Sequence, residues 1–286
     1  MLSLHTNAAA LSTKSALSHT QGALSTSMTR LGTGFRINSA MDDAAGLQIA
    51  TRLNGQTRGM AVAMRNTQNG ISMLQTAEGA FSEITNILLR MKDLATEGAN
   101  GSTTAADKTA MQAEFDALGL EVANIMTNTT FGGEAVMKSG SGKLTSAVNF
   151  QIGSATAETM TVDVTTGLSD VETAFAAVSA NYTAAATGTE LTGGGANAMI
   201  GTITTALDKV GVVRSALGAA SNRLNHVHNN LSNMSTNAEA ARGRIMDVDY
   251  ATETANMTSK QMLLQASTSM LKQSNSMSQL VLSLMQ

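Results

Sequence analysis

Apolar residues recur with a seven-residue period through the C-terminal half of the chain. One series comprises Ile203, Val210, Leu217, Leu224, Leu231, Ala238 and Ile245, and a second, three residues later, comprises Ala206, Val213, Ala220, Val227, Met234 and Ala241. Two series with this offset are the a and d positions of a coiled coil, because they form one apolar stripe along a helix. The pattern predicts one long helix over residues 203–245.

The front half of the chain carries a matching stripe. Apolar positions three or four residues apart predict a second long helix over residues 43–98, which ends at a loop containing Gly and Asn. A third, shorter helix is expected at about residues 111–125. Three helices with short links favour a bundle. The expected fold is therefore mostly α, a long antiparallel coiled-coil bundle formed by the N- and C-terminal parts of the chain.

The middle of the chain differs from both halves. Residues 139–200 are rich in Gly, Ser, Thr and Ala, and their few charges are mostly acidic. Apolar residues alternate over 148–152 and 160–164, which predicts a small β-hairpin. Residues 168–195 show no helical or strand period long enough to form a core, so we expect a short exposed outer insertion, in which changes of loop length cost little stability.

Each end of the chain carries an apolar stripe with no partner nearby in the sequence. The stripe consists of Leu4, Leu11, Leu17, Leu24, Leu31, Leu264, Leu271, Val281 and Leu284. Lone amphipathic helices gain most of their stability from packing, so a polymer that buries both ends is favoured over a monomer. We expect residues 1–42 and 250–286 to form a terminal polymerisation domain of paired helices, and residues 43–167 and 196–249 a helical core domain with the hairpin.

Composition and charge exclude several classes of protein. The chain has no Cys, which excludes disulfide scaffolds, thiolate metal sites and cysteine nucleophiles. It also has no Pro and 3% aromatic residues, so its core must consist of aliphatic residues and Met, as in packed helices. A net charge of −3 without any Lys/Arg run argues against nucleic acid as a partner.

Targeting signals are also missing from the sequence. The N-terminal residues lack the basic start and apolar block of a secretory signal peptide, and no run of 18 apolar residues occurs. We therefore expect neither a cleaved signal peptide nor contact with a membrane.

No pattern indicates catalysis, a metal or a cofactor. His226 and His228 lie two residues apart, so on a helix they face different sides. Residues 139–144 look like a phosphate loop, but Met137 and Leu144 replace the first Gly and the Ser/Thr of that motif. The acidic clusters at element junctions are expected to cap helices. They are Asp42, Asp43, Asp247 and Asp249.

Motifs at the two ends resemble the signatures of bacterial flagellins. Residues 30–46 (RLGTGFRINSAMDDAAG) are similar to the N-terminal signature, and residues 241–253 (ARGRIMDVDYATE) to its C-terminal counterpart. The tail matches as well, although Ser278 stands where the family commonly has Pro. The short middle segment suggests a short form with little or no outer domain, of which a lateral-type flagellin is one candidate.

The resemblance implies a function. It implies a structural subunit, not an enzyme, that leaves the cell through the flagellar type III channel and polymerises with copies of itself into the extracellular filament used for motility. It further implies a flagellar export chaperone and a cap protein as partners. Two alternatives stay open: a hook-filament junction protein, which shares the helical ends, and a coiled-coil effector or adhesin secreted by a type III channel.

The resemblance also implies a recognition site. Residues 89–95 and 112–114 are similar to the segments that the vertebrate Toll-like receptor 5 reads in flagellins. Carried over residue by residue, this predicts Arg90, Leu94 and Glu114 as receptor-recognition residues.

Overall fold

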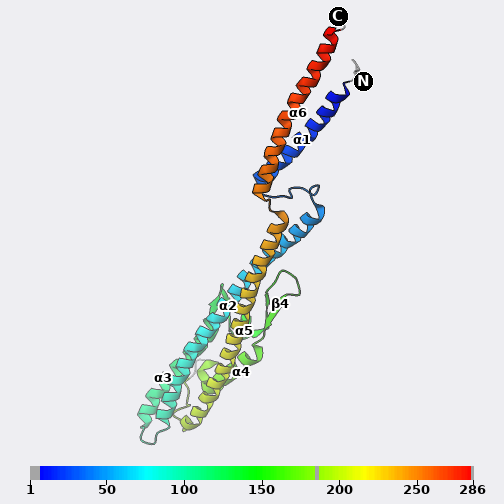
Figure 1. Cartoon of the computed structure of the whole chain (residues 1–286). Coiled ribbons are helices and arrows are strands. Elements are labelled where there is room, and N and C mark those ends of the chain that lie inside the picture. Colours follow the sequence, from blue (N-terminus) through cyan, green and yellow to red (C-terminus); the bar gives the residue numbers. More distant parts are fainter. Residues whose placement is uncertain (1–6, 184–186, 285–286) are drawn as a thin grey trace. The chain divides into compact units, whose positions relative to one another are not determined.

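Long helices dominate the computed structural model, which describes residues 7–183 and 187–284 (Figure 1). The helices are α1 (Ala8–Thr33), α2 (Ala44–Gly98), α3 (Ala105–Asn128), α4 (Thr165–Val178), α5 (Ala196–Met246) and α6 (Tyr250–Leu284). The chain divides into two compact units, one of residues 58–235 and one of the residues before and after these. This division falls within α2 and α5, whereas the sequence predicted boundaries at residues 42 and 250, close to helix starts.

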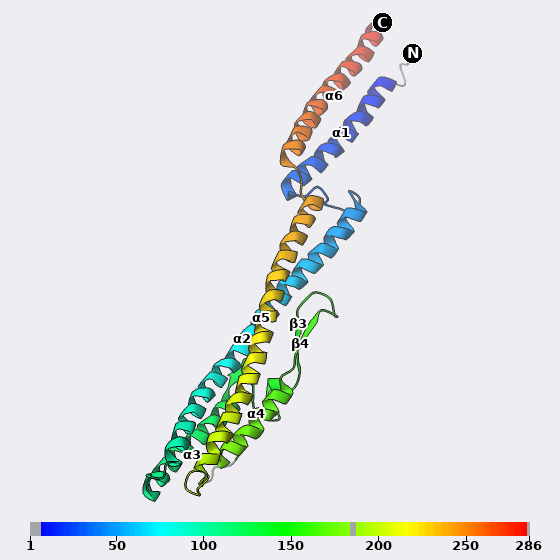
Figure 2. The same ribbon diagram turned by 60° about the horizontal axis from the view of Figure 1, so that its bottom comes forward.

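The core unit is built around α2 and α5, which lie side by side in both views (Figures 1 and 2). Phe81 of α2 and Ile203 of α5 are completely buried in one apolar cluster, which Phe115 of α3 and Phe175 of α4 also join. The predicted long helices and the shorter third helix are confirmed. The heptad positions of α5 are buried as far as Leu231, except for the half-buried Val227, and the later members are more exposed.

The predicted hairpin is present and lies against α2. Strand β3 (Val148–Gln151) pairs antiparallel with β4 (Thr159–Val162), in a register that places Phe150 opposite Met160. A Cβ atom on Gly70 of α2 would lie 2.8 Å from the Phe150 ring, so only glycine allows this approach. A smaller antiparallel pair, β1 (Thr130–Phe131) with β2 (Glu134–Ala135), follows α3.

The prediction that residues 168–195 form an exposed segment without a helical period is wrong. Most of the first half of this segment lies in α4, which turns Leu168, Val171, Phe175 and Val178 into the core. These four residues are spaced by three, four and three, so they share one helix face. The Phe175 ring also packs edge-on against Tyr182, with 5.5 Å between the ring centroids.

A buried glutamine holds the second half of that segment against α3. The Gln112 side chain is 2% exposed, and its amide nitrogen donates to Asp116 and Glu190, each at 2.7 Å. Its oxygen accepts from the Leu191 backbone N–H at 2.7 Å, and Leu191 itself is fully buried. Buried polar groups with their partners in place fix a segment strongly, because any displacement leaves them unpaired.

The terminal unit contains α1 and α6, which lie side by side in both views (Figures 1 and 2). The segment that follows α1 pairs with the segment that precedes α6. Phe35 forms an antiparallel bridge with Asp247, and the Val248 N–H donates to the Gly34 carbonyl at 3.0 Å. Gly34 ends α1 with a φ of 76°, and its N–H donates to the Arg30 carbonyl. A left-handed residue at this position is the usual stop of a helix.

Candidate assembly and recognition surfaces

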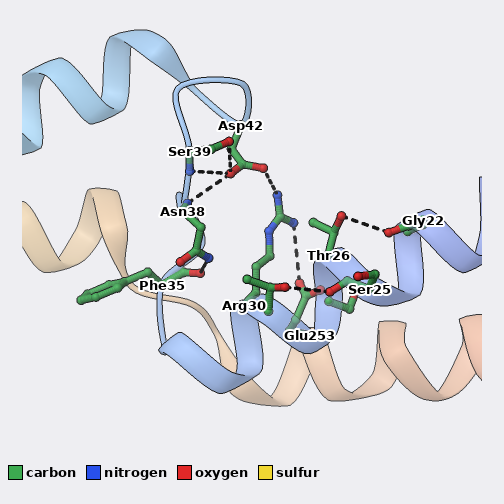
Figure 3. A network of polar contacts seen from close by, with 12 residues as sticks. Gly22, Ser25, Thr26, Arg30, Phe35, Asn38, Ser39, Asp42 and Glu253 are labelled. Atoms are coloured by element: carbon green, nitrogen blue, oxygen red, sulfur yellow. Dashed lines mark hydrogen bonds and ion pairs between the residues drawn. The ribbon is translucent and has the colours of Figure 1, made fainter.

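A charged cluster joins the start of α6 to the end of α1 (Figure 3). The Arg30 guanidinium of α1 lies between two carboxylates, 3.5 Å from Asp42 in the following link and 4.0 Å from Glu253 of α6. The Glu253 side chain is only 10% exposed. Since a buried carboxylate is costly without a nearby cation, Arg30 is what allows Glu253 to lie in the interface between the two helices.

Asp42 shapes the link that follows α1. One of its oxygens accepts hydrogen bonds from the Ser39 N–H at 2.9 Å, the Asn38 N–H at 3.1 Å and the Ser39 hydroxyl at 3.1 Å (Figure 3). These bonds, the backbone ones above all, lower the pKa of Asp42, and Arg30 lowers it further. The neighbouring Asp43 accepts from the Gly46 N–H at 2.8 Å, at the start of α2. Asp43 therefore caps α2, as the sequence predicts, whereas Asp42 organises the preceding turn instead of capping a helix.

Polar contacts connect α1 and α6 along their length. The Lys260 ammonium of α6 donates to the Ser27 hydroxyl at 2.7 Å and to the Ala23 carbonyl at 3.4 Å. Farther along, the Asn7 amide donates to the Ser274 hydroxyl at 3.1 Å. Leu24, Ser27 and Glu253 are the buried side chains in the parts of these two helices whose side chains the structure describes. Two of these three side chains are polar.

The residues of the predicted assembly stripe differ in how exposed they are. Leu11 is 65% exposed, Leu24 is 9% exposed, and the other described members are half-buried, namely Leu17, Leu31, Leu264 and Leu271. Leu4, Val281 and Leu284 lie outside the residues whose side chains are described. On the described part of α6, Met262 at 60%, Leu263 at 54% and Met270 at 65% are more exposed than Leu264 and Leu271.

Two of the predicted recognition residues meet across α2 and α3. The Arg90 Nε atom lies 2.7 Å from the Glu114 carboxylate, and both side chains are about half exposed, at 52% and 45%. The hydrogen bond to Glu114 raises the pKa of Arg90. Leu94 differs from this pair, because it is 2% exposed and belongs to the core. Its assignment as a surface contact is therefore wrong, since a receptor could not touch it without opening the helix packing.

The described residues hold no group of three or more His, Asp and Glu side chains that could bind a metal ion. The segment that looks like a phosphate loop leads into a three-residue 3₁₀ helix, Lys143–Thr145, whereas a phosphate loop is followed by an α-helix. None of the helices in the described part of the chain has both the length and the hydropathy of a membrane span.

Comparison with known proteins explains the pairing of the two ends. The bacterial flagellin N-terminal helical region matches residues 4–143, and the bacterial flagellin C-terminal helical region matches residues 200–285. The chain belongs to the bacterial flagellin family. Flagellin A of Vibrio cholerae is 33% identical over 381 residues, covering 100% of both chains. Polar flagellin F of Vibrio parahaemolyticus is 33% identical over 378 residues, covering 99% of both.

Two solved structures are also similar. Bacillus cereus flagellin is 31% identical, with a TM-score of 0.48, over 62% of this chain and 94% of that one. A putative flagellar hook-associated protein from Vibrio parahaemolyticus is 16% identical, with a TM-score of 0.54, over 72% of this chain and 100% of that one. The second likeness concerns the fold alone.

As a flagellin, the chain is a structural protein and not an enzyme. It is a subunit of the extracellular flagellar filament of bacterial motility, which it forms by self-polymerisation after export through the flagellar type III channel.

Proposed function

We propose that the α1–α6 pair is the part of this flagellin that holds the filament together. The observation that carries the proposal is that the pair leaves Leu11, Met262 and Met270 more than half exposed while it buries polar side chains. Each large apolar side chain contributes about 1.5–3 kcal/mol when it is removed from water, so these residues favour contact with other subunits. Residues 1–42 and 250–286 are accordingly the polymerisation part, and the helical core supports it.

A triple variant tests this role. Met262→Ser, Leu263→Ser and Met270→Ser together should give a folded, helical protein that no longer sediments as filaments after seeding. A matched control, Val212→Ser, removes an equally exposed apolar residue of α5, 63% exposed, and should weaken polymerisation less. Normal filaments from the triple variant, seen by electron microscopy, would contradict the proposal.

We propose three further properties that the flagellin family suggests. An export chaperone holds the subunit before secretion, and a cap protein guides its addition to the filament. Binding of each to the purified chain by calorimetry tests these partners. The N-terminus is not processed on export, which N-terminal sequencing of purified filaments tests.

We also propose that Toll-like receptor 5 recognises the exposed ion pair Arg90–Glu114. A guanidinium held by a carboxylate presents a rigid, planar set of donors, which suits specific recognition. Arg90→Ala and Glu114→Ala should each lower receptor signalling by the monomer. Lys108→Ala, a half-buried cation of the same helix as Glu114, serves as control. Unchanged signalling by the double variant Arg90→Ala/Glu114→Ala would remove the site.

A further inference from the structure

The contact of Lys260 with α1 is unusual because it places an ammonium group where a helix pair normally has apolar side chains. Ser27, which accepts its hydrogen bond, is 0% exposed, and the second acceptor is the backbone carbonyl of Ala23. Residues 23 and 27 are one helical turn apart, so both acceptors lie on the same face of α1. Their side chains are small, which leaves room for the lysine stem to lie over them.

The apolar contacts of this pair cannot by themselves fix how far α1 is displaced along α6. Leu24 is the buried apolar side chain in the described parts of the two helices, and apolar contact has no direction. Because each face of a helix repeats after three or four residues, a slip by one turn brings similar residues together again. Directional contacts distinguish the two arrangements, and among those described above between α1 and α6 the Lys260–Ser27 hydrogen bond is the shortest, at 2.7 Å, against 3.1 Å for Asn7–Ser274 and 4.0 Å for Arg30–Glu253.

We propose that Lys260 sets the register of α1 against α6 and thereby positions the two halves of the assembly surface; this rests on the proposed role of the pair in polymerisation. In the correct register, one ammonium group satisfies a buried hydroxyl and a carbonyl. After a slip, the ammonium and Ser27 would lose these partners while still partly desolvated. A single polar residue in a coiled-coil seam specifies register in the same manner.

The charges nearby oppose a slip in one direction. A displacement by one turn towards the C-terminal end of α1 moves Lys260 from the level of residues 23–27 to that of residues 27–31. Arg30 lies there, and the same slip carries its partner Glu253, which is on α6, away from it. Two cations would then meet in a partly buried position, which is unfavourable.

The register is measurable because the chain has no Cys, so two introduced cysteines can carry spin labels without background. Ser12→Cys in α1 and Thr254→Cys in α6 are exposed and lie near opposite ends of the pair. The distance between the labels therefore changes by about 5 Å when one helix slips by one turn. It is recorded in the monomer and in filaments in which labelled chains are diluted with unlabelled ones.

Lys260→Met is the decisive variant, because Met keeps the stem and a high helix propensity but donates no hydrogen bond. We expect unchanged helicity, a second distance population displaced by about 5 Å, and loss of most of the sedimenting polymer. Lys260→Arg restores donors and should give the original single distance and polymer. Lys272→Met, which alters the other lysine of α6 on an exposed position, should behave as the unaltered chain.

Two results would contradict the inference in different ways. A single unshifted distance in Lys260→Met overturns the inference, and it leaves the role of the pair in polymerisation untouched. A shifted distance with normal filaments overturns the link between register and assembly. It also counts against the proposed role of the α1–α6 pair in polymerisation.

Discussion

The core unit and the terminal helix pair are both helical, yet they differ in how much apolar surface they bury. The core encloses Phe81, Phe115 and Phe175 with many aliphatic residues, and its buried glutamine has all its partners. In the described parts of α1 and α6, Ser27 and Glu253 are buried while Met262 and Met270 face outward. The core thus contains its own source of stability, whereas the pair keeps its apolar surface for other subunits.

The largest difference between the two units is expected from a substitution that creates a cavity in the core. Phe81→Ala should destabilise the monomer by about 3–5 kcal/mol, because the ring is completely buried and leaves a cavity. Met262→Ala, at 60% exposed, should change monomer stability by less than about 0.5 kcal/mol. Urea unfolding of both monomers measures the difference. Similar losses in the two variants would show that the pair is stabilised within the monomer.

The packing of the hairpin on α2 should give an intermediate effect. Gly70→Ala places a methyl group 2.8 Å from the Phe150 ring and 3.3 Å from Leu224, so it should cost about 1–3 kcal/mol. Gly79→Ala on the same helix meets nothing within 4 Å and should instead stabilise by up to about 1 kcal/mol. Thermal unfolding separates the two. Equal shifts of the same sign would mean that the hairpin does not rest on α2.

The exposed pair of the core unit should matter little for stability. Arg90 and Glu114 are both about half exposed, and solvent screens such pairs so strongly that they add little to stability. Arg90→Ala should therefore leave the denaturation midpoint nearly unchanged, even where receptor signalling falls. A midpoint shift as large as that of Gly70→Ala would indicate a structural role for this ion pair.

The smallest effect is expected at the link after α1 and depends on pH. Since hydrogen bonds lower the pKa of Asp42 in the folded chain, its stabilising contribution is present above the unfolded pKa of about 4 and is lost as pH falls through the lower folded value. Hydrogen exchange of residues 36–42, corrected for its intrinsic pH dependence, should accelerate there. Asp42→Asn should show the same acceleration at neutral pH. No change in either experiment would contradict the role of Asp42.

The elements that the sequence predicts correctly have hydrophobic patterns that repeat many times, so that a few exceptions do not hide them. The stripe of α2 and the heptads of α5 continue over many turns, and the hairpin alternates cleanly. Helix α4 escaped prediction because it has only four core positions, within a stretch of small residues. The hydrogen bonds of Gln112 to Glu190 and Leu191 could not be predicted from local sequence, because these partners lie far from Gln112 in the chain.

The sequence by itself determined the long helices and that the two ends belong together, because periodicity and end motifs are local properties of the chain. Its resemblance to flagellins supplied Arg90, Leu94 and Glu114 as candidates for recognition, but not which of them face solvent. Only the tertiary structure decided that Leu94 is buried while Arg90 meets Glu114, and that Lys260 reaches Ser27. Burial and hydrogen bonding depend on what a neighbouring element covers, and the helices that supply these contacts are distant in sequence.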